Sequence, residues 1–299
     1  MNYVLHLSIY LGIYCIAALS LNIIVGYCGL LTMAHAAYFA IGSYVYAITT
    51  TRFLWTPLQA ASMAVGASVV LSVVVSLAPR RFKRDSFVLI SLAVQVIVFS
   101  VIANWFEPMT PPGTLRNLTN GPFGISGVLR PSIFGISLEP LARFAALAVG
   151  AALVFAVVLH FLLNSPWGRL LKASRDDELV ARGLGKNVDL ARIQAFAFAC
   201  GSVAFAGALY ASYVGYIDPS TASLDHSILM LSLVIVGGTG NIRGPLAGAA
   251  VLLLLPEALR TARIDDAVAA SVRLLIFGVL LVVMMHLRPQ GLLGEYRVR

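Results

Sequence analysis

The chain has 299 residues, of which 59% are hydrophobic and only 11% are charged. Because a soluble globular domain carries about 25% charged residues, this composition excludes a soluble protein and predicts several membrane spans of about 20 residues each. The formal net charge of +8 does not indicate nucleic-acid binding, since the basic residues cluster at the ends of apolar segments rather than along one face.

Nine apolar segments follow one another along the chain. They cover residues 4–25, 34–51, 58–78, 86–106, 141–163, 193–217, 227–239, 244–259 and 269–287. The first, third, fourth, fifth, sixth and last are long enough to cross a bilayer. The second is short and rich in Gly and Ala, and the seventh and eighth are short and interrupted by Gly and Pro. Such pieces are typical of broken or re-entrant helices buried in protein.

These segments predict an all-α polytopic membrane protein, a single domain over residues 1–299 with about 8–10 transmembrane or re-entrant helices. The first basic residue is Arg52, so no Lys or Arg precedes the first apolar run. That pattern is not one of a cleavable signal peptide, and we expect the first segment to remain as a span. Residues 107–140 are rich in Pro and Gly and read as a long external loop.

The polar interruption 164–192 stands out from its apolar surroundings. It holds six of the 21 basic residues and four of the 13 acidic ones. Basic residues are typical of cytoplasmic loops, so this interruption is expected on the cytoplasmic side. The alternative to a specific role is a solvated loop that only sets orientation. The acidic run Asp176–Glu178 argues against that alternative, because acidic side chains are unfavourable near anionic lipid. A protein partner explains them better.

The same interruption carries the signals of two short amphipathic helices. Ser165 followed by Pro166 is typical of a helix start. For the second helix we expect a capping box formed by Ser174 and Asp177.

Further signals define the second helix. Glu178 and Arg182 have the favourable i,i+4 spacing, Val180 and Leu184 form an apolar stripe, and Gly185 is expected as the residue that ends the helix.

Few polar residues interrupt the apolar segments. Asn22, Gln95 and Asn104 either line a solute path or form interhelical hydrogen bonds. His35 either lines the path or braces a re-entrant segment. No Asp or Glu lies deep in a long span, which argues against an ion-coupled transporter.

The remaining path candidates are glycines. Gly237, Gly238 and Gly240 interrupt a short apolar segment, where they permit close packing in a broken helix. They belong to the sequence VGGTG (236–240), which matches VGYCG (25–29) as a possible internal repeat or as a coincidence of composition. Cys15, Cys28 and Cys200 have no metal-ligand or disulfide spacing, so we expect no metal site and interpret them as interior residues.

Several stretches together resemble the permeases of ABC importers of the branched-chain amino acid type, specifically the LivM-like subunit more than the LivH-like one. They are SPWGRLLKASRDDELVARGLGKNV (165–188), SLNIIVGYCGLLTMAHAAYFAIGSY (20–44), LTNGPFGI (118–125), GALYASYVGYIDPSTASLDHSI (207–228), VIVGGTGNIRGPLAGA (234–249) and RPQGLLG (288–294). The resemblance covers nearly the whole chain. It implies a multi-pass protein of the bacterial inner membrane that imports branched-chain amino acids.

The resemblance also implies the partners: a LivH-like sister permease, two cytoplasmic ABC ATPase subunits and a periplasmic solute-binding protein. The chain would be no enzyme and would hold no cofactor, since ATP would be used by the partner subunits. The sequence agrees, because it contains no GxxxxGK[ST] phosphate-binding loop. In this family the cytoplasmic loop docks in a cleft of the ATPase. The coupling candidates implied are Gly168, Arg169, Arg175, Asp177, Glu178, Ala181, Leu184 and Gly185.

One residue departs from the family pattern. Gly183 stands where the family usually has Ala, and Gly costs a helix about 1 kcal/mol relative to Ala.

Three other functions stay open. Similar permeases handle urea, amides or other small organic solutes, which remain alternative substrates. A stand-alone secondary transporter is a less favoured alternative. A membrane enzyme is a third, although Asp265, Asp266 and His226 match no known site.

Overall fold

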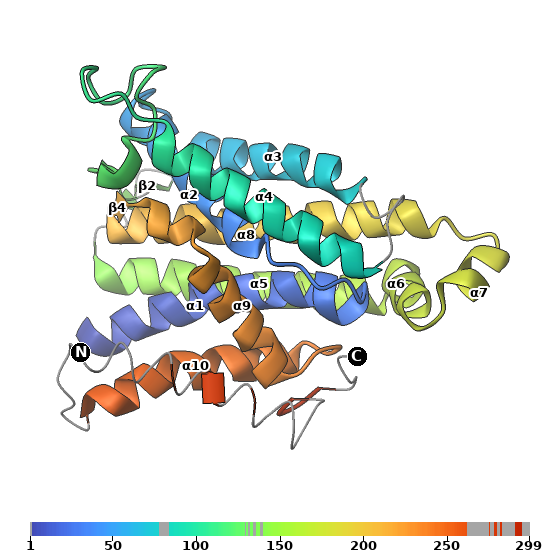
Figure 1. The fold of residues 1–299 in the computed structure, drawn as a ribbon. Helices are drawn as coiled ribbons and strands as arrows, with labels where there is room; N and C mark the ends of the chain where they lie inside the picture. Colours follow the sequence, from blue (N-terminus) through green and yellow to red (C-terminus); the bar gives the residue numbers. More distant parts are fainter. Residues whose placement is uncertain are drawn as a thin grey trace.

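Nearly all regular structure in the described residues is helical (Figure 1). The computed structural model describes residues 2–77, 84–128, 130, 132–133, 136–137, 140–261, 275, 278–279, 282 and 291–294. In chain order the helices are α1 (Asn2–Asn22), the π-helix η1 (Ile23–Tyr27), α2 (His35–Thr51), α3 (Pro57–Ser76), α4 (Arg84–Asn104), the 3-10 helix η3 (Gly121–Phe123), α5 (Leu141–Asn164), α6 (Pro166–Asp176), α7 (Glu178–Gly183), α8 (Val188–Val214), the 3-10 helix η4 (Pro219–Ala222), α9 (Leu224–Gly237) and α10 (Arg243–Thr261). The predicted all-α class is confirmed.

Within the described residues, five helices are long and apolar enough to cross a membrane. They span Tyr3–Tyr27, Pro57–Ser76, Ser86–Asn104, Leu141–Asn164 and Val188–Val214. These are the first, third, fourth, fifth and sixth of the predicted segments, and each was expected to cross. Most of the last predicted segment, 269–287, lies outside the described residues.

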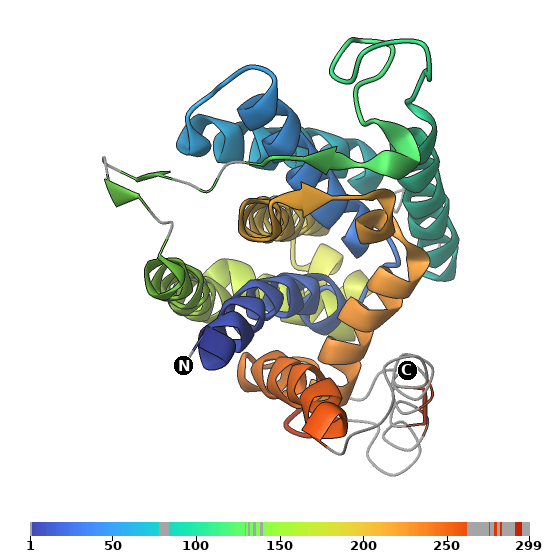
Figure 2. The same cartoon turned by 90° about the vertical axis from the view of Figure 1, so that its left-hand side faces the viewer.

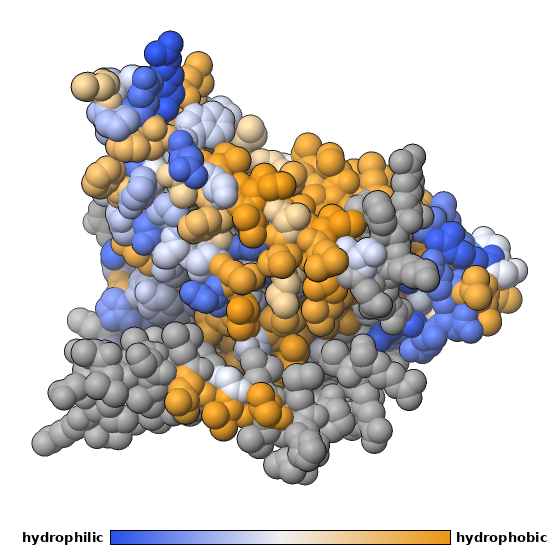
Figure 3. Space-filling view, in the orientation of Figure 1, coloured by the Kyte–Doolittle hydropathy of each residue, from blue (hydrophilic) through white to orange (hydrophobic). Residues whose placement is uncertain are grey.

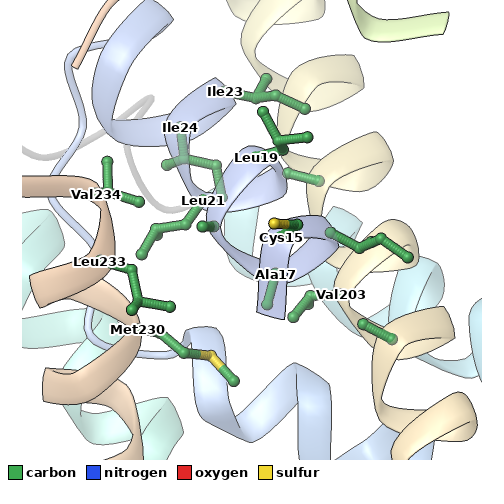
Figure 4. Packing of buried hydrophobic residues seen from close by; sticks show 14 of the residues in the cluster. Cys15, Ala17, Leu19, Leu21, Ile23, Ile24, Val203, Met230, Leu233 and Val234 are labelled. Carbon is green, nitrogen blue, oxygen red and sulfur yellow. The ribbon is translucent and has the colours of Figure 1, made fainter. Parts of the chain in front are cut away.

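Helix α1 is the centre of the bundle. It packs against α5, α8, α9 and α10, and the view in Figure 2 shows it among them. Its apolar window is 89% buried, against 28% for α3 and 22% for each of α4 and α5. In Figure 4, Leu233 and Val234 of α9 point toward α1, and Val203 of α8 approaches it from the other side. The α3, α4 and α5 helices therefore present the outer apolar surface, part of which is visible in Figure 3.

The short helices α2 and α9 lie inside the bundle, as predicted for a Gly- and Ala-rich piece and for a short piece interrupted by Gly that both need cover by protein. Helix α2 crosses α8 so closely that a Cβ atom on Gly42 would lie 2.1 Å from the backbone oxygen of Ala204. A Cβ atom on Gly207 of α8 would lie 2.1 Å from the backbone oxygen of Phe39. Small residues permit this approach, which replaces the hydrophobic effect as the source of helix association in lipid.

The segment after α4 is largely non-helical in its described part, as predicted for 107–140. Its strand β1 (Ile125–Ser126) pairs antiparallel with β4 (Tyr216–Ile217), which follows α8. Strands β2 (Ser132–Ile133) and β3 (Ile136–Ser137) pair with each other. This segment and the N-terminus lie at one end of the bundle, while α6 and α7 lie at the other (Figure 1). The two predicted loops thus occupy opposite ends.

Candidate functional site

Two short helices, α6 and α7, form the polar interruption, as predicted. Ser165 occupies the N-cap position of α6 and Pro166 the first turn. The Ser165 hydroxyl does not cap, because it donates a 2.6 Å hydrogen bond back to the Leu162 carbonyl oxygen. A Cβ atom on Gly168 would lie 2.1 Å from the Leu163 backbone oxygen, so the turn from α5 into α6 has no room for a larger residue there.

The predicted capping box of Ser174 and Asp177 is wrong. Helix α6 continues to Asp176, which places Ser174 inside it, where its hydroxyl donates to the Leu171 carbonyl oxygen at 2.9 Å. Asp177 has an extended backbone and caps α7 by itself. Its Oδ1 accepts hydrogen bonds from the amides of Leu179 and Val180 at 2.9 Å and 3.1 Å. A carboxylate at this position satisfies amides that have no partner inside the helix.

An ion-pair network fastens α7 to the start of α8. Glu178 pairs with Arg182 and with Arg192, each at 2.8 Å, and Arg182 pairs with Asp189 at 2.7 Å. Arg192 also donates to the carbonyl oxygen of Ser174 at 3.1 Å. The predicted i,i+4 pair is confirmed, but it is one part of a larger arrangement that joins three helices.

The network sets the charge state of its central carboxylate. Partial burial acts to raise the pKa of Glu178, but hydrogen bonds from Arg192 and Arg182 outweigh it, so the pKa is lowered. The hydrogen bonds to Glu178 and Asp189 raise the pKa of Arg182. Glu178 is therefore a carboxylate at neutral pH, as an ion-pair network requires.

The tip of the interruption exposes apolar side chains. Leu179 is 82% exposed and Leu184 73% exposed, and Val180 lies between them on the exposed surface. The predicted stripe of Val180 and Leu184 thus faces outward, while Ala181 is the buried residue of α7. Figure 3 shows these apolar residues among hydrophilic ones at the α7 end of the molecule. Exposed apolar groups rimmed by polar ones mark interaction surfaces.

The eight coupling candidates fall into three groups. Gly168 and Ala181 are buried, so neither offers a surface for contact with a partner. Asp177 caps, Glu178 forms ion pairs, and Arg169 and Arg175 donate to the carbonyl oxygens of Asn164 and Gly26. Leu184 is exposed, and Gly185 has φ +72° at the end of α7, where Gly was predicted to end it. The sequence interpretation missed Lys172, Leu179, Asp189 and Arg192, whose partners or exposure no local spacing reveals.

Asn22 is fully buried, and both ends of its side-chain amide are occupied. The Nδ2 atom donates to the Asn241 carbonyl oxygen at 2.8 Å, and Oδ1 accepts from the Gly240 amide at 3.2 Å. The two halves of the possible repeat meet beside it, since a Cβ atom on Gly26 would lie 2.9 Å from the Gly240 nitrogen. Gly29 and Gly240, at matching positions of the repeat, both have positive φ, +65° and +94°.

The other polar path candidates also form hydrogen bonds within the bundle. Nε2 of His35 lies 2.9 Å from Ser20 Oγ. Gln95 accepts from the Ala37 amide at 2.8 Å and donates to the Ala222 carbonyl oxygen at 2.6 Å. Asn104 lies on the exposed side of α4 and donates to its own helix at Ser100.

Two of the glycine path candidates lie at the end of α9. A Cβ atom on Gly237 would lie 2.1 Å from the Gly244 backbone oxygen, so this residue permits the close approach of α9 and α10. Gly238 has φ +103° and ends α9. With Gly240 they form the turn between the two helices.

A cavity that the sequence did not indicate lies at the end of the bundle opposite α7. It has a volume of about 580 Å³ and is lined by Tyr3, His6, Leu7, Tyr10, Arg130, Tyr213 and Val214. The Tyr10 and Tyr213 rings meet edge to face with centroids 5.4 Å apart. This cavity combines aromatic faces with polar groups, as small-molecule sites commonly do.

The comparisons with known proteins agree with this architecture. A family model described as "Branched-chain amino acid transport system / permease component" matches residues 3–285. The permease protein LivM of a high-affinity branched-chain amino acid transport system from Escherichia coli (strain K12) is 29% identical, over 95% of this chain and 68% of LivM. The corresponding LivH protein from the same strain is 24% identical, over 95% of this chain and 92% of LivH. No solved structure matches the chain significantly. The chain belongs to the family of permease components of branched-chain amino acid transport systems.

Proposed function

We propose that this multi-pass membrane protein is the permease subunit of an ATP-driven importer in the bacterial inner membrane, with α6 and α7 as its coupling element. The observation that carries the proposal is the segment 164–192: two short helices fixed by ion pairs at one end of an apolar bundle, with Leu179 and Leu184 exposed at the tip. A loop that served only orientation would need neither the network nor the exposed leucines.

The partner of this tip is a cytoplasmic ATPase subunit. Leu179, Val180 and Leu184 supply an apolar contact, and the charged residues around them supply the polar rim typical of a protein interface. Each of two permease subunits, this chain and a sister permease of the same family, would present one such loop to one of two ATPase subunits.

Coupling follows from differential binding. ATP can drive transport only if the ATPase pair holds α6 and α7 differently when it is closed around nucleotide than when it is open. The loop joins α5 directly to α8, so a displacement of the loop moves two spans. Rigid-body movement of packed helices then alternates access to the two sides of the membrane.

The proposed substrates are branched-chain amino acids, delivered by a periplasmic binding protein. The names of the LivM and LivH relatives support this class. A related permease from Salmonella paratyphi B, 30% identical over 48% of this chain, is named for autoinducer 2 import, so a solute other than an amino acid is the alternative. Urea, amides and other small organic solutes are the competing substrates. Solute would enter by the cavity at Tyr10, and Tyr10→Ala should reduce uptake without loss of ATPase co-purification. Unchanged uptake would exclude that entry point.

Reconstitution tests the proposal. The chain is placed in proteoliposomes with a sister permease, the ATPases and a binding protein from the same organism, and uptake of radiolabelled Leu, Ile, Val and urea is compared. We expect ATP-dependent uptake of the amino acids only. Uptake by the two permeases without ATPase subunits would identify a secondary transporter, and ATP-driven uptake of urea alone would correct the substrate.

A further inference from the structure

The turn that follows α1 departs from α-helical geometry at the point where residues 164–192, the coupling loop, contact it. Residues Ile23–Tyr27 form the π-helix η1, and all five are buried. Single π turns are frequent at functional sites. Carbonyl groups at a helix end have no partner within the helix, and the Gly26 carbonyl oxygen accepts a hydrogen bond from Arg175 of α6.

A second cation of α6 contacts the same π turn. The ammonium group of Lys172 lies 5.2 Å from the centre of the Tyr27 ring, within the range of a cation–π interaction. Lys172 and Arg175 are three residues apart and so lie on one side of α6. The coupling loop therefore contacts α1 as well as the two spans to which it is covalently joined.

The π turn is in turn fastened to the far part of the chain. Asn22, which immediately precedes η1, binds both the Gly240 amide and the Asn241 carbonyl oxygen. The Asn241 side chain accepts from the Gly244 amide at 2.7 Å, at the start of α10. A Cβ atom on Gly26 would lie 2.1 Å from Asn22 Oδ1 and 2.9 Å from the Gly240 nitrogen, so the two turns are in direct contact.

We infer that η1 is a coupling joint: Arg175 and Lys172 transmit displacement of the coupling loop to the end of α1, and Asn22 passes it to the turn 238–242 between α9 and α10. The inference rests on the proposed function. Its physical requirement is an element with two arrangements whose balance both ends bias. A change of η1 from its i to i+5 hydrogen bonds to the α register would supply those two arrangements.

The contrasting interpretation is that these contacts only hold the fold together. Variants at Asn22 leave the docking surface intact, because this residue is fully buried and cannot touch an ATPase subunit. The leading variants are Asn22→Leu, which removes both hydrogen bonds at similar volume, and Gly26→Ala, which forces the two turns apart. Lys172→Gln, with Lys172→Arg as the conservative partner, tests the cation contact. Arg116→Gln is the control, since it removes one positive charge from an exposed side chain that lies outside both the joint and the proposed docking surface.

The experiment uses the complete complex in nanodiscs with the binding protein present. It measures ATPase co-purification, basal ATP hydrolysis, and solute transported per ATP hydrolysed. For Asn22→Leu and Gly26→Ala we expect normal co-purification and hydrolysis but a fall in transport per ATP of about tenfold, within the usual range of coupling between sites. Lys172→Gln should show a smaller fall that Lys172→Arg restores, and Arg116→Gln should match the wild type.

A distance measurement distinguishes a joint that transmits movement from contacts that only hold the fold together. Spin labels are attached at Arg243→Cys and Leu115→Cys, while the three native cysteines are buried and should not react. We expect trapping of ATP to shift the distance between the labels in the wild type and not in Asn22→Leu. If Asn22→Leu and Gly26→Ala both keep normal transport per ATP and the wild-type change in label distance, the proposed joint is refuted.

Two further outcomes are informative. If Asn22→Leu and Gly26→Ala do not assemble, the Lys172 pair decides, and normal coupling in Lys172→Gln refutes the joint. The proposed docking is judged separately by Glu178→Arg: full co-purification and full stimulation by the binding protein would refute the docking.

Discussion

Arg192, near the start of α8, donates a 2.8 Å hydrogen bond to Glu178, the first residue of α7. The bond joins the outermost helix of the coupling loop to a helix long enough to span the membrane. Arg192 is only 12% exposed at its side chain, whereas Glu178 is 38% exposed. The pair therefore spans the boundary between the bundle and the surface that we assign to the ATPase.

Reversal of the charge at Glu178 should uncouple transport. Glu178→Arg would place three guanidinium groups together and break the Glu178–Arg192 link between α7 and α8, while the transmembrane packing is untouched. We expect the permease to remain folded, and stimulation of ATP hydrolysis by the loaded binding protein to fall about tenfold or more, a coupling loss of at least 1.4 kcal/mol. Purified complexes assayed with and without binding protein give the measurement.

A charge exchange controls that result. Glu178→Arg combined with Arg192→Glu restores one opposite pair and should recover part of the stimulation, because the pair itself and not the residue types holds α7. Normal stimulation in the single variant would show that α7 is not the docking element.

The attachment of α7 should weaken in acid. The pKa of Glu178 is lowered in the folded protein from an ordinary value of 4.5. A lowered pKa contributes stability that is fully present above about pH 4.5 and is lost as pH falls through the folded pKa. The mobility of a spin label at Leu184→Cys should therefore be constant from neutral pH to about pH 5 and rise below it. Glu178→Gln should be mobile throughout, and equal acid response in both proteins would exclude Glu178 as the titrating group.

Two neighbouring glycines should respond oppositely to replacement by Ala. A Cβ atom on Gly183, the last residue of α7, would meet no atom within 4 Å, so Gly183→Ala should stabilise α7 by roughly 0.4–1 kcal/mol. Gly185 has φ +72°, where Gly185→Ala should cost roughly 1–2 kcal/mol. Amide hydrogen exchange across residues 178–185 measures both. Equal protection in the two variants would contradict the backbone assignment.

The sequence predicted elements whose signals are local. The five long spans, the two short helices and the Gly185 terminus follow from runs of apolar residues, from i,i+4 spacing and from glycine chemistry. The N-cap of α7 was assigned wrongly because Ser174 and Asp177 both suit a cap. Only the extent of α6, set by burial of Leu171 and Ser174 against the bundle, decides between them.

The contacts that connect the loop to the bundle were beyond sequence reasoning. Asn22 and Asn241 are 219 residues apart, so no periodicity relates them. The π turn at Ile23–Tyr27 reads as ordinary apolar sequence. From the sequence, the polar residues of the spans could either line a solute path or brace the helices by hydrogen bonds. In the structure, Asn22, His35 and Gln95 form hydrogen bonds within the bundle.

The close crossing of α2 and α8 predicts a sharp size limit. Gly42→Ala would place its Cβ atom between 2.1 Å and 2.6 Å from three backbone atoms of Ala204, none of which is a flexible side chain. Overpacking of this kind costs roughly 1–3 kcal/mol. Gly150→Ala in α5 is the control, because its Cβ atom would meet nothing within 4 Å. We expect a lower thermal midpoint in detergent for Gly42→Ala alone, and similar midpoints would place the two helices further apart.

Photo-crosslinking is the most direct test of the central claim, which is that the ATPase drives transport by acting on the coupling loop. A photoreactive phenylalanine analogue replaces Leu184 at the tip of the coupling loop or, as control, Leu115 at the opposite end of the molecule, where the side chain is 84% exposed. In the assembled complex we predict a crosslink to the ATPase subunit from position 184 that changes in yield when ATP is trapped, and none from position 115. Absence of an ATPase crosslink at 184 in an active transporter would contradict the account.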